Sequence, residues 1–335
     1  MKNQKLQATA LTIFILSVLI LALILAKNIL VPLAISFLFT YLIYPITWRI
    51  ERNGVPRVFS ILLVIVVALV IMGLSVFYFS INLPTLSVDL NGIKQQILSE
   101  STSLKFMIED QFGVDLNSME YYSERAVDGI INAIQSSSGN IFEATATILF
   151  QVFILPVFTF FILFYRTKTA YFIFRLVGRK RRLKAIKILR EVSAVTSKYL
   201  GGILLVVLIL AFLNSLGLLI IGVPHAIVLG VGSALLNLIP YFGTLIGALI
   251  PIIYILISVP NPMDMAVQVV IMFIIVQFLE NNIITPNVVG GNVKLNPLTI
   301  IIGLLVGNLI WGIPGMLIAI PYIAILKVVM RNIEI

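Results

Sequence analysis

The sequence predicts an all-α polytopic membrane protein with about eight membrane segments. Apolar residues make up 60% of its 335 residues and charged residues only 11%, whereas soluble domains have about 45–50% apolar and about 25% charged residues. Several apolar runs reach about 20 residues, the length that an α-helix needs to cross a bilayer. Because a backbone in hydrocarbon must satisfy its own hydrogen bonds, we expect these runs to be helices.

The apolar runs follow one another along the whole chain. The first five cover residues 8–26, 29–47, 59–83, 146–165 and 199–222, and the last three cover 226–258, 265–284 and 298–326. Two of the last three are longer than one crossing needs, and they contain Pro240 and Pro314. Proline lacks the backbone N–H and clashes with the preceding helical turn. We therefore expect two broken segments, near Pro240 and near Pro314.

A polar stretch, residues 84–145, separates the third run from the fourth. It carries nine acidic residues and three basic ones, and its apolar residues recur at helix-like intervals. This spacing indicates amphipathic helices outside the membrane. The sequence thus predicts three parts: 1–83 with membrane segments 1–3, a small acidic helical insert at 84–145, and 146–335 with segments 4–8.

A basic loop, residues 166–190, indicates how the chain is oriented. It holds ten Lys and Arg residues and no acid, and its densest part is Arg179, Lys180, Arg181 and Arg182. Short positive loops lie in the cytoplasm, so we expect a cytoplasmic N-terminus and an extracytoplasmic insert. Basic residues beside a membrane attract anionic lipid headgroups. Aromatic residues are too few in this loop to indicate a nucleic-acid site.

Polar side chains gather near the end of the seventh run. Gln277, Glu280 and Asn281 stand at i, i+3 and i+4, which places them on one face of a helix, and Asn282 follows. A carboxylate at membrane depth is expensive and usually faces a bundle interior or a water-filled cavity. Glu280 is therefore the first candidate for an ion or substrate site. The alternative is an acid at the membrane interface, solvated by headgroups and water.

The break in the sixth run is a second candidate part of a transport pathway. Asn237 and Thr244 flank it, and Pro240 and Gly243 lie within it. In transporters, broken helices place half-helix ends and freed carbonyls at substrate or ion sites. The alternative is an ordinary proline kink. In the last run, four glycines at close spacing indicate helix packing in lipid, namely Gly303, Gly307, Gly312 and Gly315.

Composition also excludes several kinds of chemistry. The chain has no cysteine and one histidine, which excludes disulfides, thiolate metal sites and a multi-histidine site within one chain. No nucleophile motif, phosphate loop or paired intramembrane acids occur in the sequence. We therefore predict a protein that is not an enzyme and that uses no cofactor and no metal centre.

Several short patterns together match a known family. They comprise Pro32, residues 41–45 (YLIYP), Arg52, Gly54, Arg57, residues 235–243 (LLNLIPYFG), residues 277–290 (QFLENNIITPNVVG), residues 295–297 (LNP), Gly307, Gly312, Gly315, Pro321 and Lys327. With these residues the chain resembles the AI-2E (autoinducer-2 exporter-like) family of bacterial membrane proteins. One departure is Pro314, where a non-proline residue is more usual.

The resemblance implies about eight membrane segments in a bacterial cell membrane, a soluble insert after the third, and homo-oligomers. It also implies export of small molecules such as autoinducer-2, although some members are described as sodium(lithium)/proton antiporters. The leading hypothesis is export of a small polar solute through the broken helices of the C-terminal half. The alternatives are a Na⁺(Li⁺)/H⁺ antiporter that uses Glu280 and a non-transporting membrane scaffold that acts through the 84–145 insert.

Overall fold

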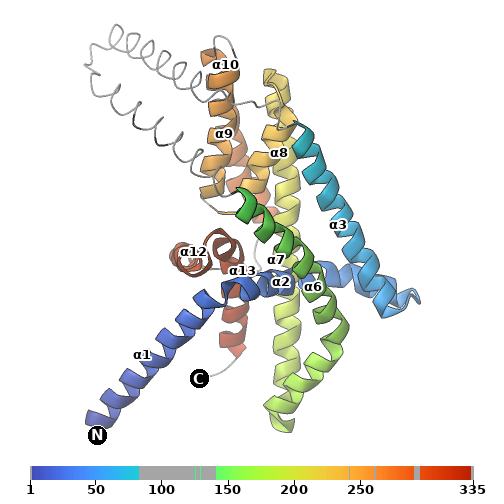
Figure 1. Ribbon diagram of the computed structural model, residues 1–335, viewed down its shortest axis with the longest axis vertical. Helices are drawn as coiled ribbons and strands as arrows, with labels where there is room; N and C mark the ends of the chain where they lie inside the picture. Colours follow the sequence, from blue (N-terminus) through green and yellow to red (C-terminus); the bar gives the residue numbers. More distant parts are fainter. Residues whose placement is uncertain are drawn as a thin grey trace. The chain divides into compact units, whose positions relative to one another are not determined.

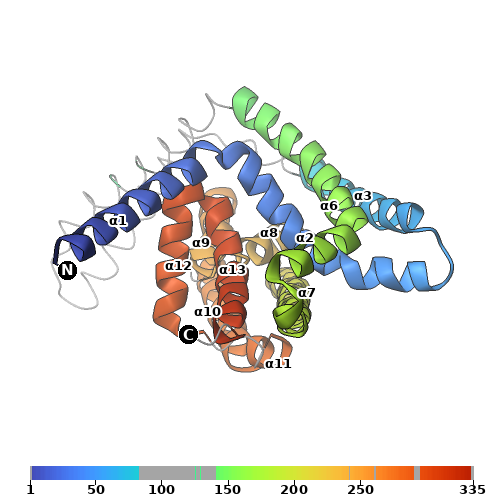
Figure 2. The same ribbon diagram turned by 90° about the horizontal axis from the view of Figure 1, so that it is seen from below.

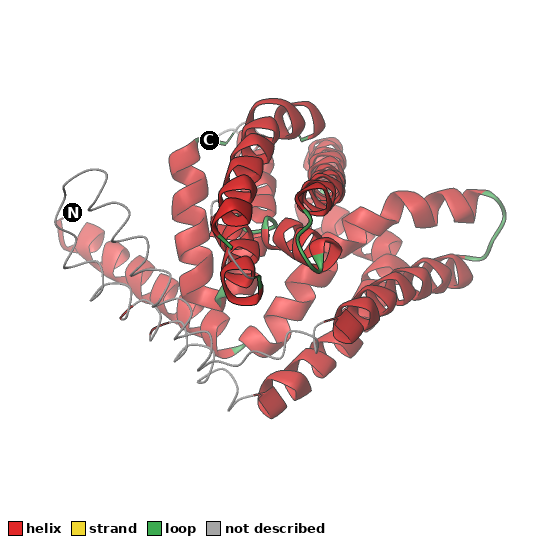
Figure 3. Ribbon diagram, turned by 90° about the horizontal axis from the view of Figure 1, so that it is seen from above, coloured by secondary structure: helices red, strands yellow, loops and turns green. Residues whose placement is uncertain are grey.

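The described part of the chain is helical throughout. The computed structural model describes residues 2–82, Arg125, Gly129, 141–240, 242–259, 262–289 and 295–332. Within these residues there are helices and no strand (Figure 3). Most of the predicted 84–145 insert lies outside the described residues. The prediction of an all-α polytopic membrane protein is confirmed.

The described residues of the N-terminal half form four long helices (Figure 1). They are α1 (Lys2–Leu25), α2 (Lys27–Arg52), α3 (Arg57–Asn82) and α6 (Ile141–Val177). A 3₁₀ turn, η1 (Arg179–Arg181), then leads into α7 (Arg182–Ile221). The turn follows Gly178, whose φ of 79° is readily adopted only by glycine. The four bases Arg179–Arg182 of the predicted lipid-facing loop therefore span the corner between α6 and α7.

The C-terminal half consists of shorter helices. They are α8 (Ala226–Leu236), α9 (Phe242–Ser258), α10 (Met263–Leu279), the π-helix η2 (Glu280–Ile284), α11 (Thr285–Val288), α12 (Pro297–Trp311) and α13 (Ile313–Asn332). The sixth predicted segment corresponds to α8 and α9, and the eighth to α12 and α13. Six helical stretches of the described chain are long and apolar enough to cross a membrane, and α1, α8, α9 and α12 contain shorter apolar helices.

Both predicted breaks are present. The first separates α8 from α9 around Pro240. The second lies at Gly312, whose φ of 66° and ψ of −146° end the helix. Only glycine adopts this conformation without strain. Pro314 comes two residues later, in the first turn of α13, where the N–H that proline lacks has no intrahelical partner in any case. The glycine therefore makes this break, and the proline follows it.

The structure divides into two compact units, each described separately. The first unit comprises Met1–Ile71, Gln151–Val206 and Ile284–Ile335, and the second comprises Met72–Phe150 and Val207–Ile283. This division follows packing, whereas the division predicted from the sequence follows membrane topology. The three topological parts therefore stay a prediction.

In the first unit, α2, α3 and α6 share an apolar core. Its buried residues are Ile43, Ile61, Val64, Ile65 and Leu163. At one end of these helices the Nη1 and Nη2 atoms of Arg166 in α6 both donate to the Glu51 carboxylate in α2, Nη1 at 3.0 Å. In α2, Pro45 cannot donate to the carbonyl of Tyr41, four residues earlier. The Ser197 hydroxyl of α7 donates to that carbonyl at 2.7 Å instead.

Also in the first unit, α12 and α13 lie side by side as a tight hairpin (Figure 2). A Cβ on Gly307 would lie 2.5 Å from the carbonyl oxygen of Gly315, and a Cβ on Gly303 would overlap the side chain of Ile323. Three of the four glycines singled out in the sequence therefore lie at this helix–helix contact. The fourth, Gly312, forms the turn between the two helices.

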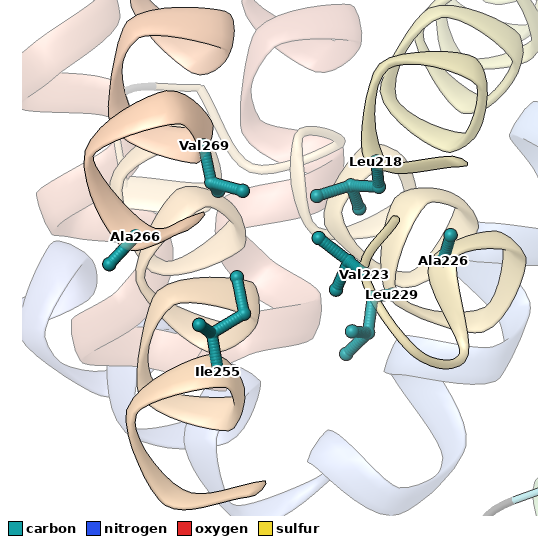
Figure 4. Packing of buried hydrophobic residues seen from close by; sticks show 7 residues of the cluster. All are labelled: Leu218, Val223, Ala226, Leu229, Ile255, Ala266 and Val269. Atoms are coloured by element: carbon teal, nitrogen blue, oxygen red, sulfur yellow. The ribbon is translucent and has the colours of Figure 1, made fainter. Parts of the chain in front are cut away.

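In the second unit, α8, α9 and α10 pack side by side (Figure 1). Figure 4 shows their shared core with the end of α7, which consists of Leu218, Val223, Ala226, Leu229, Ile255, Ala266 and Val269. Helix α8 approaches α7 closely at Gly230, where a Cβ would overlap Ser215. This core supports the polar residues around Glu280.

Candidate functional site

The Glu280 carboxylate is buried in the second unit and held by two amides. The Nδ2 of Asn237 donates to Oε1 at 2.7 Å, and the Nε2 of Gln277 donates to Oε2 at 3.1 Å. Glu280 is only 9% exposed. This burial contradicts the alternative of an acid solvated at the interface. Within the described chain no Lys, Arg or His forms an ion pair with Glu280, so neutral amides hold it.

The predicted polar face of the seventh segment is formed in part. Gln277 Nε2 also donates to Asn281 Oδ1 at 3.3 Å, which links the residues at i, i+3 and i+4. Asn281 itself is exposed. The Asn282 amide donates to the carbonyl of Phe278 at 2.8 Å and is also exposed, so it is not part of the cluster around Glu280.

A π-helix begins at Glu280. The five residues Glu280–Ile284 interrupt the α-helical pattern between α10 and α11. Such single π-turns are rare and frequently occur at functional sites. Here the turn begins at the buried carboxylate and contains both asparagines that follow it. The sequence analysis did not predict this feature.

The break between α8 and α9 places Asn237 beside Glu280. Asn237 is the C-cap of α8, and tight turns satisfy the next backbone groups: Leu238 N donates to Leu235 O at 3.1 Å, and Ile239 N donates to Leu236 O at 3.0 Å. The chain re-enters a helix at Phe242. A Cβ on Gly243 would overlap the carbonyl of Leu236, so this turn requires glycine.

A serine hydroxyl near the break links α8 to α9. Ser233 Oγ lies 2.5 Å from the carbonyl oxygen of Gly247 and 2.8 Å from that of Leu229. Pro251, inside α9, has no N–H for the Gly247 carbonyl four residues earlier. Ser233 therefore supplies the donor that the proline removes. A Cβ on Gly247 would lie 2.8 Å from Ser233 O, so the glycine permits this close approach.

These residues enclose a small cavity of about 20 Å³. Its polar lining consists of Asn214, Ser233, Asn237, Thr244, Gln277 and Glu280, and its other lining residues are Leu210, Gly247, Phe273 and Val276. The structure thus brings together four of the residues predicted for the pathway: Glu280, Gln277, Asn237 and Thr244. Pro240 and Gly243 shape the adjoining break.

The sequence analysis missed two polar members of the cavity, Asn214 and Ser233. Asn214 is a buried asparagine in the apolar α7, and a polar residue at membrane depth is itself a signal of function. Ser233 carries no such signal, because its role depends on a proline in the next helix. In the described residues, no group of three or more His, Cys, Asp or Glu comes together to hold a metal. The chemistry of the cavity is that of one carboxylate with neutral amides and hydroxyls.

Comparisons with known proteins agree on one family. The profile described as "AI-2E family transporter" matches residues 13–335. The "Putative transport protein YrrI" of Bacillus subtilis is 30% identical over 315 residues, which cover 91% of this chain and 86% of that protein. The "Putative transport protein YueF" of the same organism is 27% identical, with coverages of 90% and 83%.

A more distant relative carries a more specific name. The "AI-2 transport protein TqsA" of Escherichia coli is 22% identical over 320 residues, which cover 92% of this chain and 87% of that protein. The match to the family profile includes every residue of the cavity. The chain is a multi-pass membrane protein, and it belongs to the AI-2E family of transporters.

Proposed function

We propose that the chain exports a small polar solute of the autoinducer-2 type, and that the cavity beside Glu280 lies on the transport pathway. One observation carries the proposal: the Glu280 carboxylate is buried where α8 and α9 are separated by a break and α10 passes into a π-turn. Broken helices form substrate sites in secondary transporters because they place free backbone ends and polar side chains inside the membrane.

The polar groups of the cavity favour a neutral, hydroxyl-rich solute. Three amides and two hydroxyls line the cavity, and the one charged group already accepts two amide hydrogen bonds. Amides and hydroxyls both donate and accept, so they can replace the water around a hydroxylated solute. The name of the relative TqsA, an AI-2 transport protein, supports autoinducer-2 as the first solute to test.

Export requires a defined orientation of the chain in the membrane, and the distribution of basic residues supports one orientation. We place the protein in the bacterial cell membrane with its N-terminus in the cytoplasm, because the basic loop at 166–190 is the strongest cytoplasmic signal in the chain. We further propose that Arg179, Arg181 and Arg182, which are exposed, contact anionic lipid headgroups. Assembly into a homo-oligomer, and a scaffold role of the 84–145 insert, stay predictions.

A second candidate function is Na⁺(Li⁺)/H⁺ antiport through Glu280. The observation in its favour is that Glu280 has amide partners and no basic partner within the described residues. A buried carboxylate without a fixed positive neighbour can exchange a proton for another cation, and intramembrane acids take part in proton relays in pumps and transporters. A solute exporter and an antiporter differ in which gradients the wild-type protein dissipates.

The experiment measures flux through the purified protein in liposomes that are loaded with autoinducer-2. Proton and sodium gradients are imposed across the liposome membrane. The exporter predicts autoinducer-2 efflux that falls in Glu280→Gln. The matched control is Asp264→Asn, which removes an exposed acid from the same helical segment. Sodium-dependent proton movement that is lost in Glu280→Gln, without autoinducer-2 efflux, would instead establish antiport. The absence of both fluxes in the wild type would contradict both functions.

A further inference from the structure

We infer that the cavity beside Glu280 binds one hydroxyl-type hydrogen-bond donor, on the carbonyl oxygen of Asn214. The shared chemistry is a single O–H group, which either a water molecule or a hydroxyl of the transported solute can supply. The site itself follows from the side chains of the second unit. Only its occupation by solute depends on the proposed function.

The reason to expect a ligand is a buried polar atom of Asn214 that has no hydrogen-bond partner among the described residues. The Asn214 side chain lines the cavity and is 4% exposed, and its Oδ1 has no hydrogen-bond partner in the described part of the chain. Nearly all buried polar atoms of native proteins are hydrogen-bonded, because an unsatisfied one retains the full penalty of leaving water. A carbonyl oxygen is only an acceptor. In this orientation of the Asn214 amide, the missing partner is a donor.

Neither Thr244 nor any other polar group of the lining donates to Asn214 Oδ1 in the described part of the chain. The Ser233 hydroxyl lies within hydrogen-bond distance of two backbone carbonyls. The Asn237 and Gln277 amides donate to Glu280, and the Gln277 amide also donates to Asn281. Glu280 is itself an acceptor. The acceptor that the cavity offers to an occupant is therefore the Asn214 carbonyl oxygen.

The size of the cavity limits the ligand to one small group. A volume of about 20 Å³ is room for about one water molecule. A hydroxyl group of a larger solute has the same size and the same donor. A bare metal cation suits the site less well, because hard cations take about six or more oxygens and each Glu280 oxygen already faces an amide N–H. Leu210, Phe273 and Val276 supply the rest of the lining.

The test is a high-resolution structure of the purified full-length chain in lipid nanodiscs, in sodium-free buffer, with and without autoinducer-2. We expect a discrete density peak at about 2.8 Å from Asn214 Oδ1. A peak without solute identifies water, and a peak that appears only as part of bound solute identifies the solute hydroxyl. The absence of a peak under both conditions would overturn the inference. A peak that appears only when sodium is added would overturn it in favour of a cation.

Two variants extend the test. Asn214→Leu keeps most of the side-chain volume but removes the acceptor. Asn214→Ala replaces it in the test if the Asn214→Leu protein does not fold. Either variant should lose the peak. The control is Ser215→Ala, because Ser215 packs against Gly230 and does not line the cavity. It should keep the peak. A peak that persists unchanged in Asn214→Leu and Asn214→Ala would also contradict the assignment.

Flux separates this inference from the proposed function. With autoinducer-2 in liposomes, Asn214→Leu should slow efflux about tenfold, as expected for the loss of one hydrogen bond in a water-poor site. Ser215→Ala should stay close to wild type. If wild-type protein moves no autoinducer-2, the proposed function fails, whereas the density at Asn214 still decides the inference.

Discussion

Asn237 and Glu280, 43 positions apart in the chain, are joined by a 2.7 Å hydrogen bond from the Asn237 amide to the Glu280 carboxylate. Asn237 caps the end of α8, and Glu280 begins the π-turn after α10. The bond therefore ties together two places where the regular helical pattern stops. Because the carboxylate is buried, the bond contributes both to the stability of the fold and to the chemistry of the cavity.

Asn237→Leu should leave Glu280 Oε1 without its donor. A buried charged group that loses a hydrogen bond destabilises a protein by about 1–3 kcal/mol, so we expect a lower midpoint of thermal unfolding and slower solute flux. Asn282→Leu is the control, because Asn282 is exposed and bonded to its own helix. Unfolding of both variants in detergent, followed by fluorescence, measures the difference. Equal midpoints for the two variants would contradict the assigned role of Asn237.

Ser233→Ala should free the Gly247 carbonyl that Pro251 leaves without a helical donor. We expect a loss of about 1–3 kcal/mol in stability. Pro251→Ala restores the backbone N–H, so the serine should matter less in that background. A double-mutant cycle on the free energy of unfolding measures this coupling. Strict additivity of the two substitutions would show that the hydroxyl does not replace the missing donor.

Gly243→Ala should prevent the close turn between α8 and α9. Its Cβ would overlap the backbone carbonyl of Leu236, and a backbone clash cannot be relieved by a change of rotamer. We expect a strong loss of folded protein, measured as the monodisperse fraction after purification. Gly73→Ala is the control, because its Cβ would meet no atom within 4 Å and alanine favours a helix by about 1 kcal/mol over glycine. Normal yield from Gly243→Ala would contradict the turn geometry.

The absence of cysteine from the sequence allows a direct test of orientation. Single-cysteine variants Gly129→Cys, in the acidic insert, and Lys180→Cys, in the basic loop, should react differently with a membrane-impermeant maleimide. We expect Gly129→Cys to be labelled in intact cells and Lys180→Cys only after permeabilisation, because positive loops stay in the cytoplasm. The reverse pattern would place the N-terminus outside.

Much of the fold follows from features that are local in the sequence. Length and apolarity predict the helices. Proline predicts the position of the two breaks, because its effect on the backbone does not depend on distant residues. At the second break, however, Gly312 ends the helix, and the sequence analysis had assigned this glycine to helix packing. The spacing of Gln277, Glu280 and Asn281 predicts a shared face, and the hydrogen bonds from Gln277 to the other two confirm that face.

The rest depends on contacts between helices, which spacing within one run does not reveal. Asn214 reaches the cavity from α7 and Ser233 from α8, so no pattern inside the seventh segment could identify them. The π-turn at Glu280 depends on a shift of backbone hydrogen bonds that has no simple composition signal. Asn282 is adjacent in the sequence to the residues that share the polar face, but it lies two residues along the helix from Glu280 and therefore on another face.

The most direct test of the central claim is chemical modification of Thr244, which lines the cavity. In the cysteine-free chain, Thr244→Cys should lose autoinducer-2 flux when treated with a small thiol reagent, and added autoinducer-2 should slow the reaction. Leu245→Cys, at the next position and outside the cavity lining, should keep its flux under the same treatment. Full labelling of Thr244→Cys with unchanged flux would place the pathway elsewhere and contradict the account.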